Sequence, residues 1–297
     1  MNAYIRGLRL ERWPRSLAIA LGSASFFFLH REALGEFSPG VIAWRLILAF
    51  VLTWIISTAN YVVNEIVDAP FDAHHPVKRL RPLVQREIRT VPFALMGAAL
   101  TAVGLGGAWL LFSRAFFFSV LALLAAGFIY NVKPVRTKDI PFLDAISESA
   151  NNPIRFLIGW FAFAPSHHWP PLSLIVGWWA FGNFLMTAKR LSEFRLLKEK
   201  AADYRLSHKR YTKKELLLGM IASALVTLAS AAYGALELKI PALLYFTPIL
   251  ALYLSLFFRK TLEEKEIMEE PESLLRNPLI ALSTLALAGL FALSFFL

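Results

Sequence analysis

Long blocks of apolar residues constrain this sequence more than any other feature. A helix needs about 20 predominantly apolar residues to cross the hydrocarbon of a bilayer. Hydrophobic residues make up 57% of the 297 positions, and they occur in continuous runs rather than in alternation with polar ones. The sequence therefore predicts an all-α integral membrane protein.

We expect nine membrane-spanning helices that form a single domain over residues 1–297. The first resembles a signal peptide in its length, but Trp13-Pro14 before it and the lack of a small-residue cleavage site after it favour a retained helix. No internal repeat, long linker or low-complexity segment divides the sequence. The predicted spans are residues 16–30, 41–63, 91–112, 114–130, 141–164, 170–188, 215–236, 241–258 and 277–297.

Lysine and arginine fall on alternate sides of these spans. Of the 31 such residues, 26 lie before the first span or in the second, fourth, sixth and eighth loops. Positively charged loops usually stay in the cytoplasm, so we expect a cytoplasmic N-terminus and an outer C-terminus in the cell membrane. The net charge of +10 then reflects contact with anionic lipid headgroups and not nucleic-acid binding. The absence of cysteine excludes disulfides and thiol chemistry.

A first polar cluster occupies the stretch NEIVDAPFDAHHPVKRLRP, which begins with Asn64. On a helix, Asn64, Asp68 and Asp72 would point one amide oxygen and two carboxylates in the same direction, because residues four apart share a face. Mg²⁺ prefers such oxygen ligands and commonly combines one or two carboxylates with substrate phosphates and water. Pro70 should kink the helix or end it near Ala69.

The basic half of this stretch follows the acids at once as H-P-x-K-x-x-R-P, opened by His75. One interpretation is a solvated helix end whose acids pair with Lys78, Arg79 and Arg81. The other is a site that holds a phosphate or diphosphate through metal ions on one side and through Lys78 and Arg81 on the other. The spacing of the acids at a membrane surface favours the second interpretation.

A second polar run, KPVRTKDIPFLDAISESANNPIRFLIGW, leads into the fifth predicted span. Asp144 and Glu148 are four residues apart, and Arg155 follows three turns after Asp144. Ionisable groups within a span are costly and usually face the bundle interior or a wet cavity. They could form an internal ion pair of Arg155 with either acid, or a second wall of the same metal or phosphate site. Three cations would line its cytoplasmic mouth: Lys133, Arg136 and Lys138.

A third cluster, MTAKRLSEFRLLKEK, ends the sixth predicted span. Lys189, Arg190 and Glu193 would lie within about one helical turn at the membrane surface. A positively charged membrane anchor explains the later residues of this loop, from Lys198 to Lys214. For Lys189 and Arg190 we favour anion binding. Three glycines in the third span predict close helix contacts: Gly104, Gly106 and Gly107.

Together these motifs resemble those of the UbiA superfamily of intramembrane prenyltransferases, and the resemblance covers almost the whole sequence. It implies a helical bundle with cytoplasmic cap loops that binds a polyprenyl diphosphate through Mg²⁺ held by the aspartate motifs. Within the superfamily the sequence is most similar to the decaprenyl-phosphate phosphoribosyltransferases, although Glu65 stands where an aspartate is usual. The resemblance implies catalytic roles for Asn64, Asp68 and Asp72, metal binding by these three and Asp144, and substrate binding by His75, Lys78, Arg81, Tyr130, Lys133, Glu148, Arg155, Lys189, Arg190 and Glu193.

The resemblance leaves three functions to compare. The first is Mg²⁺-dependent transfer of phosphoribosyl from phosphoribosyl diphosphate to a polyprenyl phosphate, which the K-R-x-x-E element and Arg155 favour. The second is alkylation of an aromatic or other small acceptor by a polyprenyl diphosphate. The third is a transporter or lipid-binding protein without catalysis, which Pro153 within the fifth span would suit. Because the charge clusters are predicted at one membrane face and not at its centre, the third is least favoured.

Overall fold

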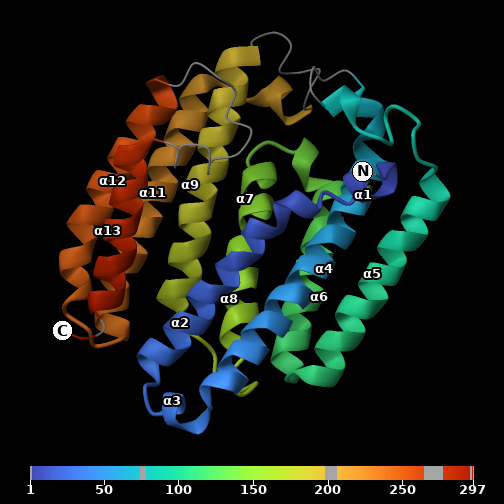
Figure 1. Cartoon of the computed structure of the whole chain (residues 1–297). Coiled ribbons are helices and arrows are strands. Elements are labelled where there is room, and N and C mark those ends of the chain that lie inside the picture. The colour runs from blue at the N-terminus through green and yellow to red at the C-terminus, as the bar shows by residue number, and fades with distance from the viewer. Residues whose placement is uncertain (1, 74–77, 198–205, 264–276, 295, 297) are drawn as a thin grey trace. The chain divides into compact units, whose positions relative to one another are not determined.

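The computed structural model describes residues 2–73, 78–197, 206–263, 277–294 and 296, and every regular element in these ranges is a helix (Figure 1). Five helices in the described ranges are long and apolar enough to cross a membrane: α4 (Pro39–Asp72), α5 (Thr90–Leu111), α6 (Arg114–Asn131), α11 (Lys213–Glu237) and α12 (Leu243–Glu263). The all-α prediction is confirmed. The number of spans and their orientation remain predictions.

Shorter or more polar helices connect and flank these five. Apolar α13 (Pro278–Ser294) has 17 residues and is shorter than each of these five. The first predicted span is α-helical only from Ile19, because a 3₁₀ helix precedes it and contains Pro14. The remaining elements are α1 (Ala3–Gly7), η1 (Leu10–Ala18), α2 (Ile19–Leu29), α3 (Ala33–Glu36), η2 (Lys78–Leu80), η3 (Thr137–Asp139), α7 (Leu143–Ser149), α8 (Asn151–Phe161), α9 (Leu172–Leu197) and η5 (Leu206–Arg210).

Local sequence signals set several helix ends. Ser38 caps α4, and Pro39 at the first helical position has the backbone angle that a helix start needs. Thr212 and Glu215 form a reciprocal capping box at the start of α11. Helix α4 does not end near Ala69 as expected, since it continues through Pro70 to Asp72.

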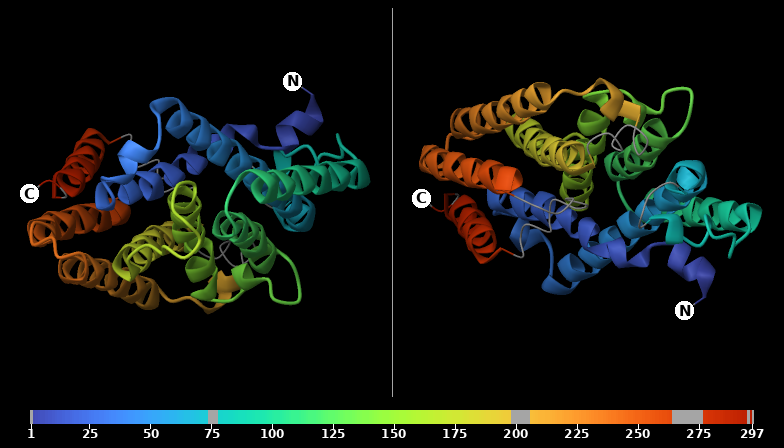
Figure 2. Two further views of the ribbon diagram at one scale, coloured as in Figure 1. Left: turned by 90° about the horizontal axis from the view of Figure 1, so that it is seen from below. Right: turned by 90° about the horizontal axis from the view of Figure 1, so that it is seen from above.

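The chain divides into two compact units. The first contains Met1–Lys138 and Ile154–Trp169. Within it α4 packs along both α5 and α6, as the views of Figures 1 and 2 show. Gly104 and Gly107 let Ile56 and Leu52 of α4 approach α5 closely, so their predicted helix contacts are confirmed. A Cβ on Gly106 would meet no described atom of a neighbouring helix within 4 Å, so the predicted contact at this glycine is not seen.

Helices α2 and α8 of the first unit meet backbone to backbone. A Cβ on Gly22 would lie 1.9 Å from the Phe156 carbonyl oxygen, and one on Gly159 would lie 1.9 Å from that of Ile19. The Ser23 hydroxyl donates to the Gly159 carbonyl over 2.8 Å. Glycine is therefore required on both helices, because no side chain fits between them.

The second unit contains Asp139–Pro153 and Pro170–Leu297. Its main contact is between α9 and α11, and α7 packs against α9 while α12 packs against α11 and α13. Glu237 at the end of α11 accepts the backbone N–H groups of Leu172 and Ser173, each over 3.0 Å, at the start of α9. This carboxylate satisfies donors that a helix start leaves without intrahelical partners.

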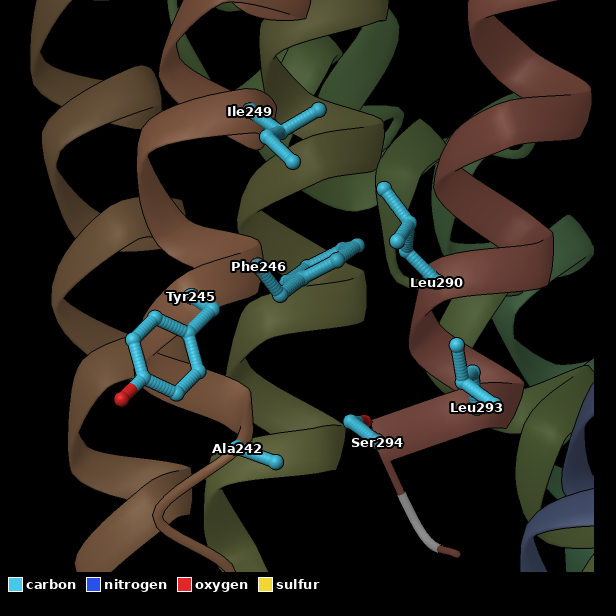
Figure 3. A pocket seen from close by; sticks show the side chains of 7 residues that line it. All are labelled: Ala242, Tyr245, Phe246, Ile249, Leu290, Leu293 and Ser294. Carbon is cyan, nitrogen blue, oxygen red and sulfur yellow. The ribbon is translucent and has the colours of Figure 1, made fainter. Parts of the chain in front are cut away.

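An apolar pocket opens between α12 and α13 within the second unit (Figure 3). Phe246 of α12 and Leu290 of α13 point toward one another across it. Apart from the hydroxyls of Tyr245 and Ser294, the lining side chains are apolar. The lining residues are Ala242, Tyr245, Phe246, Ile249, Leu290, Leu293 and Ser294.

Candidate active site

The first polar cluster forms at the end of α4. Asn64, Asp68 and Asp72 lie on one helix face, as the four-residue spacing predicts. Because the helix passes through Pro70 without ending, Asp72 extends the same row by one turn. Asp72 is 4% exposed, so this carboxylate needs partners from elsewhere in the unit.

Asp68 receives its partners from the segment after α6. Lys138 donates to Asp68 Oδ1, and Arg136 Nη2 approaches the same oxygen at 3.2 Å. Both cations are also fixed to Asn131, since Lys138 Nζ lies 3.0 Å from its side-chain oxygen and Arg136 Nη1 lies 2.9 Å from its carbonyl. This segment therefore packs against α4, and two of its cations bond to the same Asp68 carboxylate oxygen.

Asp72 and Glu65 share Arg81. The Arg81 guanidinium bonds to Asp72 Oδ2 and lies 3.1 Å from Glu65 Oε1. Glu65 is 2% exposed and is also 3.5 Å from Arg9 Nη1. Lys78 is close enough to Asp72 to act on it electrostatically. The acids at the end of α4 are thus compensated by cations from three other segments, as buried charges require.

The donor set of this cluster fits Mg²⁺ only if a ligand completes it. The described residues contain no group of three or more histidine, cysteine, aspartate or glutamate side chains close enough to hold a metal. Mg²⁺ commonly takes one or two protein carboxylates and fills its other positions with phosphate oxygens and water. Asp68 and Asp72, with the Asn64 amide on the same face, supply ligands of that kind beside cations that suit phosphate.

A second polar cluster forms in the second unit around Arg190. This side chain is wholly buried. Its Nε lies 2.8 Å from Asp144 Oδ2, its Nη2 bonds to Glu148, and its Nη1 lies 3.4 Å from Glu193 Oε2. An interior ion-pair network therefore forms, with Arg190 as its cation; the pairing of Arg155 with either acid stays a prediction. One guanidinium holds three carboxylates from α7 and α9.

Residues just before α11 complete this second cluster. The hydroxyls of Ser207 and Tyr211 donate to Asp144, the former over 3.1 Å, and His208 Nε2 lies 3.0 Å from Glu193 Oε2. Burial raises the pKa of Tyr211 well above its ordinary value, and the Asp144 carboxylate raises it further. Tyr211 therefore keeps its proton and remains a hydrogen-bond donor.

The structure places the other predicted site residues as follows. Tyr130 is half-buried, with Lys138 Nζ 6.0 Å from its ring centre, and Lys133 is exposed. Lys189 is half-buried on α9, as is Arg155 on α8. His75 lies outside the described residues, so its predicted role stays a prediction.

Sequence reasoning did not assign several residues that the fold brings to these clusters. Arg136 and Lys138 were expected only to line an entrance, yet both bind Asp68. The segment up to Lys214 was interpreted as a membrane anchor, but part of it is buried against α7 and α9. The spacing of Ser207, His208 and Tyr211 in the sequence did not indicate that their side chains would meet these acids. The unassigned residues with contacts in the clusters are Arg9, Glu65, Arg136, Lys138, Ser207, His208 and Tyr211.

The sequence matches the UbiA prenyltransferase family over residues 18–268. The chain belongs to this family. It is therefore a multi-pass membrane protein of a family of transferases, as its sequence motifs predicted.

Curated relatives of this UbiA-family protein include two decaprenyl-phosphate phosphoribosyltransferases. The protein from Mycolicibacterium smegmatis is 25% identical over 222 residues, which are 73% of this chain and 64% of the relative. That from Mycobacterium tuberculosis is 25% identical over 213 residues, 70% of this chain and 65% of the relative. The chain thus spans slightly less than two thirds of the length of these relatives.

Solved structures share the fold of this UbiA-family protein. A UbiA homolog from Archaeoglobus fulgidus bound to GPP and Mg²⁺ has a TM-score of 0.68 at 19% identity, over 99% of this chain and all of that one. An apo UbiA homolog from Aeropyrum pernix K1 has a TM-score of 0.62 at 17% identity, over 91% of this chain and 97% of that one. At these identities the likeness shows the fold alone.

Proposed function

We propose that this UbiA-family protein transfers a phosphoribosyl group from phosphoribosyl diphosphate to a polyprenyl phosphate. The observation that carries the metal and phosphate part of the proposal is the row of Asp68 and Asp72 at the end of α4, with cations from other segments bonded to both. Such a surface suits a ligand that brings both phosphate and divalent metal. The curated phosphoribosyltransferases similar to this chain support the choice of donor and acceptor.

In this reaction a phosphate oxygen of the polyprenyl phosphate attacks the anomeric carbon of the ribose. The bond from that carbon to the diphosphate breaks, and the diphosphate leaves with the electron pair. Mg²⁺, held by Asp68 and Asp72 with Asn64, would neutralise charge on the leaving diphosphate. Lys78 and Arg81 would hold phosphate oxygens. No protein base is required, because the phosphate monoester is already a nucleophile.

The second cluster, within the second unit, offers further candidates for anion contact. Lys189 and Arg190 are adjacent on α9, and Arg190 is already held by three carboxylates. A guanidinium whose charge is already balanced by three carboxylates is better suited to orient neighbouring side chains than to bind a phosphate. We therefore assign phosphate contact to Lys189 and to Arg155, as the family resemblance implies, and an orienting role to Arg190.

A second candidate function is prenyl transfer to an aromatic or other small acceptor. The fold is shared with a UbiA homolog from Archaeoglobus fulgidus, solved with GPP and Mg²⁺ and also with DMAPP and Mg²⁺. In that reaction the allylic carbon would lose diphosphate, and the acceptor would attack the resulting cation. The same aspartates and cations would hold the diphosphate, so the acidic row does not distinguish the two reactions.

The test uses protein in detergent with Mg²⁺, a polyprenyl phosphate and labelled phosphoribosyl diphosphate. We expect label in the organic phase, lost with EDTA and reduced about 100-fold or more in Asp68→Asn and Asp72→Asn. Glu36→Gln, at an exposed position of α3, is the matched control and should keep full turnover. Release of diphosphate only from an allylic diphosphate with an aromatic acceptor would favour prenyl transfer instead.

A further inference from the structure

Asp144 is the most enclosed carboxylate of the second cluster. Its side chain is 0% exposed and both of its oxygens accept hydrogen bonds. Oδ2 accepts from Arg190 and Ser207, and Oδ1 accepts from the Tyr211 hydroxyl and from the Ala145 N–H over 2.9 Å. A divalent cation would have to displace these donors. This carboxylate therefore does not fit the metal-binding role that the family resemblance implied.

Glu148 lies one helical turn after Asp144 but has a different environment. Its side chain is 21% exposed, whereas those of Asp144 and Arg190 are wholly buried. It bonds to the Nη2 group of Arg190, while Asp144 bonds to Nε of the same guanidinium. Because the guanidinium is planar and rigid, fixing Nε also fixes the direction in which Nη2 meets Glu148.

The network also fastens the segment that contains η5. Ser207 and Tyr211 tie this segment to α7 through Asp144, and His208 ties it to α9 through Glu193. Ser207, His208 and Tyr211 are all buried, while Lys209 and Arg210 between them are exposed. The segment is thus held by its buried side chains and presents its cations to solvent.

The backbone is also strained directly before α7, next to this network. Phe142, which precedes α7, has a φ of 66° and a ψ of −42°, a region that bulky residues rarely adopt. Its N–H donates to the Tyr211 hydroxyl over 2.6 Å, and Tyr211 in turn donates to Asp144. Such a conformation persists only where surrounding contacts hold it. The Tyr211–Asp144 pair therefore supports the turn from which α7 and its acids emerge.

We propose that Asp144 is a positioning residue and not a metal ligand. It orients Arg190 and Tyr211 and fastens residues 206–211 to α7 and α9. Glu148 is then the carboxylate of this motif that meets the ligand. The assignment of Glu148 rests on the proposed transferase function, while the anchoring of residues 206–211 stands without it.

Limited trypsin digestion of the full-length protein in detergent tests the anchor without requiring turnover. Trypsin cleaves after Lys209 and Arg210, and mass spectrometry identifies those products. Asp144→Asn and Tyr211→Phe should raise the cleavage rate at these two bonds ~10-fold, because local opening governs access. Tyr233→Phe, at an exposed position of α11, is the matched control and should leave the rate unchanged. Glu148→Gln should also leave it unchanged.

The half-activating Mg²⁺ concentration distinguishes the roles of the two acids. Glu148→Gln should raise it ~10-fold, the size expected for a group in contact with the metal–ligand assembly. Asp144→Asn and Tyr211→Phe should lower kcat. They should leave the half-activating Mg²⁺ concentration within about twofold of wild type. If Asp144→Asn fails to fold, Tyr211→Phe carries the test alone, since it removes one hydroxyl and keeps the ring.

Two results would overturn the proposal. One is unchanged cleavage after Lys209 and Arg210 in Tyr211→Phe and in a folded Asp144→Asn. The other is a rise in the half-activating Mg²⁺ concentration in Asp144→Asn as large as that in Glu148→Gln. A wild-type protein without Mg²⁺-dependent turnover would instead refute the proposed function, and the cleavage comparison would still decide the anchor.

Discussion

Lys138 donates a hydrogen bond to the Asp68 carboxylate, which lies 70 positions earlier in the chain. The two side chains are 8% and 18% exposed, so neither charge is fully solvated. The Lys138 ammonium group also donates a hydrogen bond to Asn131 Oδ1 over 3.0 Å. The pair joins the membrane helix α4 to the segment that follows α6.

Replacing Lys138 should therefore destabilise the first unit. Lys138→Met leaves Asp68 with Arg136 as its remaining cation, and we expect a loss of about 1–3 kcal/mol. The double variant Lys138→Met with Asp68→Asn should recover part of this loss, because the less compensated carboxylate charge is then gone. Thermal unfolding in detergent measures both, with exposed Lys214→Met as the control. Equal stability of the single variant and the wild type would show that the pair contributes nothing.

Glu65 should be needed in its charged form. It lies between Arg9 and Arg81 and is almost completely buried. Glu65→Gln keeps the shape but leaves two guanidinium groups less compensated, so we expect a loss of roughly 1–3 kcal/mol. We also expect weaker substrate binding, because Arg81 then shifts toward Asp72. A higher KM with kcat nearly unchanged would support this effect, and an unchanged KM would contradict it.

Tyr211 should impose a pH dependence on stability. Burial, and then Asp144, raise its folded-state pKa above the unfolded value of about 10. The folded protein then holds the proton more tightly, so the stabilisation is full below pH 10 and declines as the pH rises further. Unfolding temperatures between pH 8 and pH 11 should fall less steeply in Tyr211→Phe than in the wild type. Parallel curves for the two proteins would exclude this contribution.

The close contact of α2 and α8 should not tolerate a methyl group. Gly159→Ala would place a Cβ against the Ile19 carbonyl oxygen, and backbone atoms cannot move aside as a flexible side chain can. We expect a loss of roughly 1–3 kcal/mol or failure to fold. Gly106→Ala is the matched control, since its added Cβ meets no described atom within 4 Å and alanine favours a helix. Similar unfolding temperatures for the two variants would contradict the packing argument.

Periodicity predicted the acidic row correctly because the geometry of one helix fixes it. Residues four apart share a face whatever surrounds them, so Asn64, Asp68 and Asp72 could be placed together from the sequence. Pro70 was the exception. We expected a kink or an end near Ala69, and the expected end was wrong, because α4 continues through Pro70 to Asp72.

Partners across the chain could not be predicted in the same way. The sequence offered Arg155 as the cation for Asp144 and Glu148, because it follows them on one predicted helix. The fold also brings Arg190 of α9 to both acids, which no pattern in the sequence indicated. Similarly, Tyr211 and Ser207 had no periodic signal, and only packing against α7 brings their hydroxyls to Asp144.

The sequence by itself determined that this protein is a helical membrane protein of the UbiA family, since apolar run length and short motifs are local properties. It also determined which face of α4 carries the acids. Only the tertiary structure decided which cation meets which carboxylate, which carboxylates are enclosed, and which keep access to solvent. Those choices depend on burial and on contacts between segments far apart in the chain, because the cost of an enclosed charge is set by its neighbours in space.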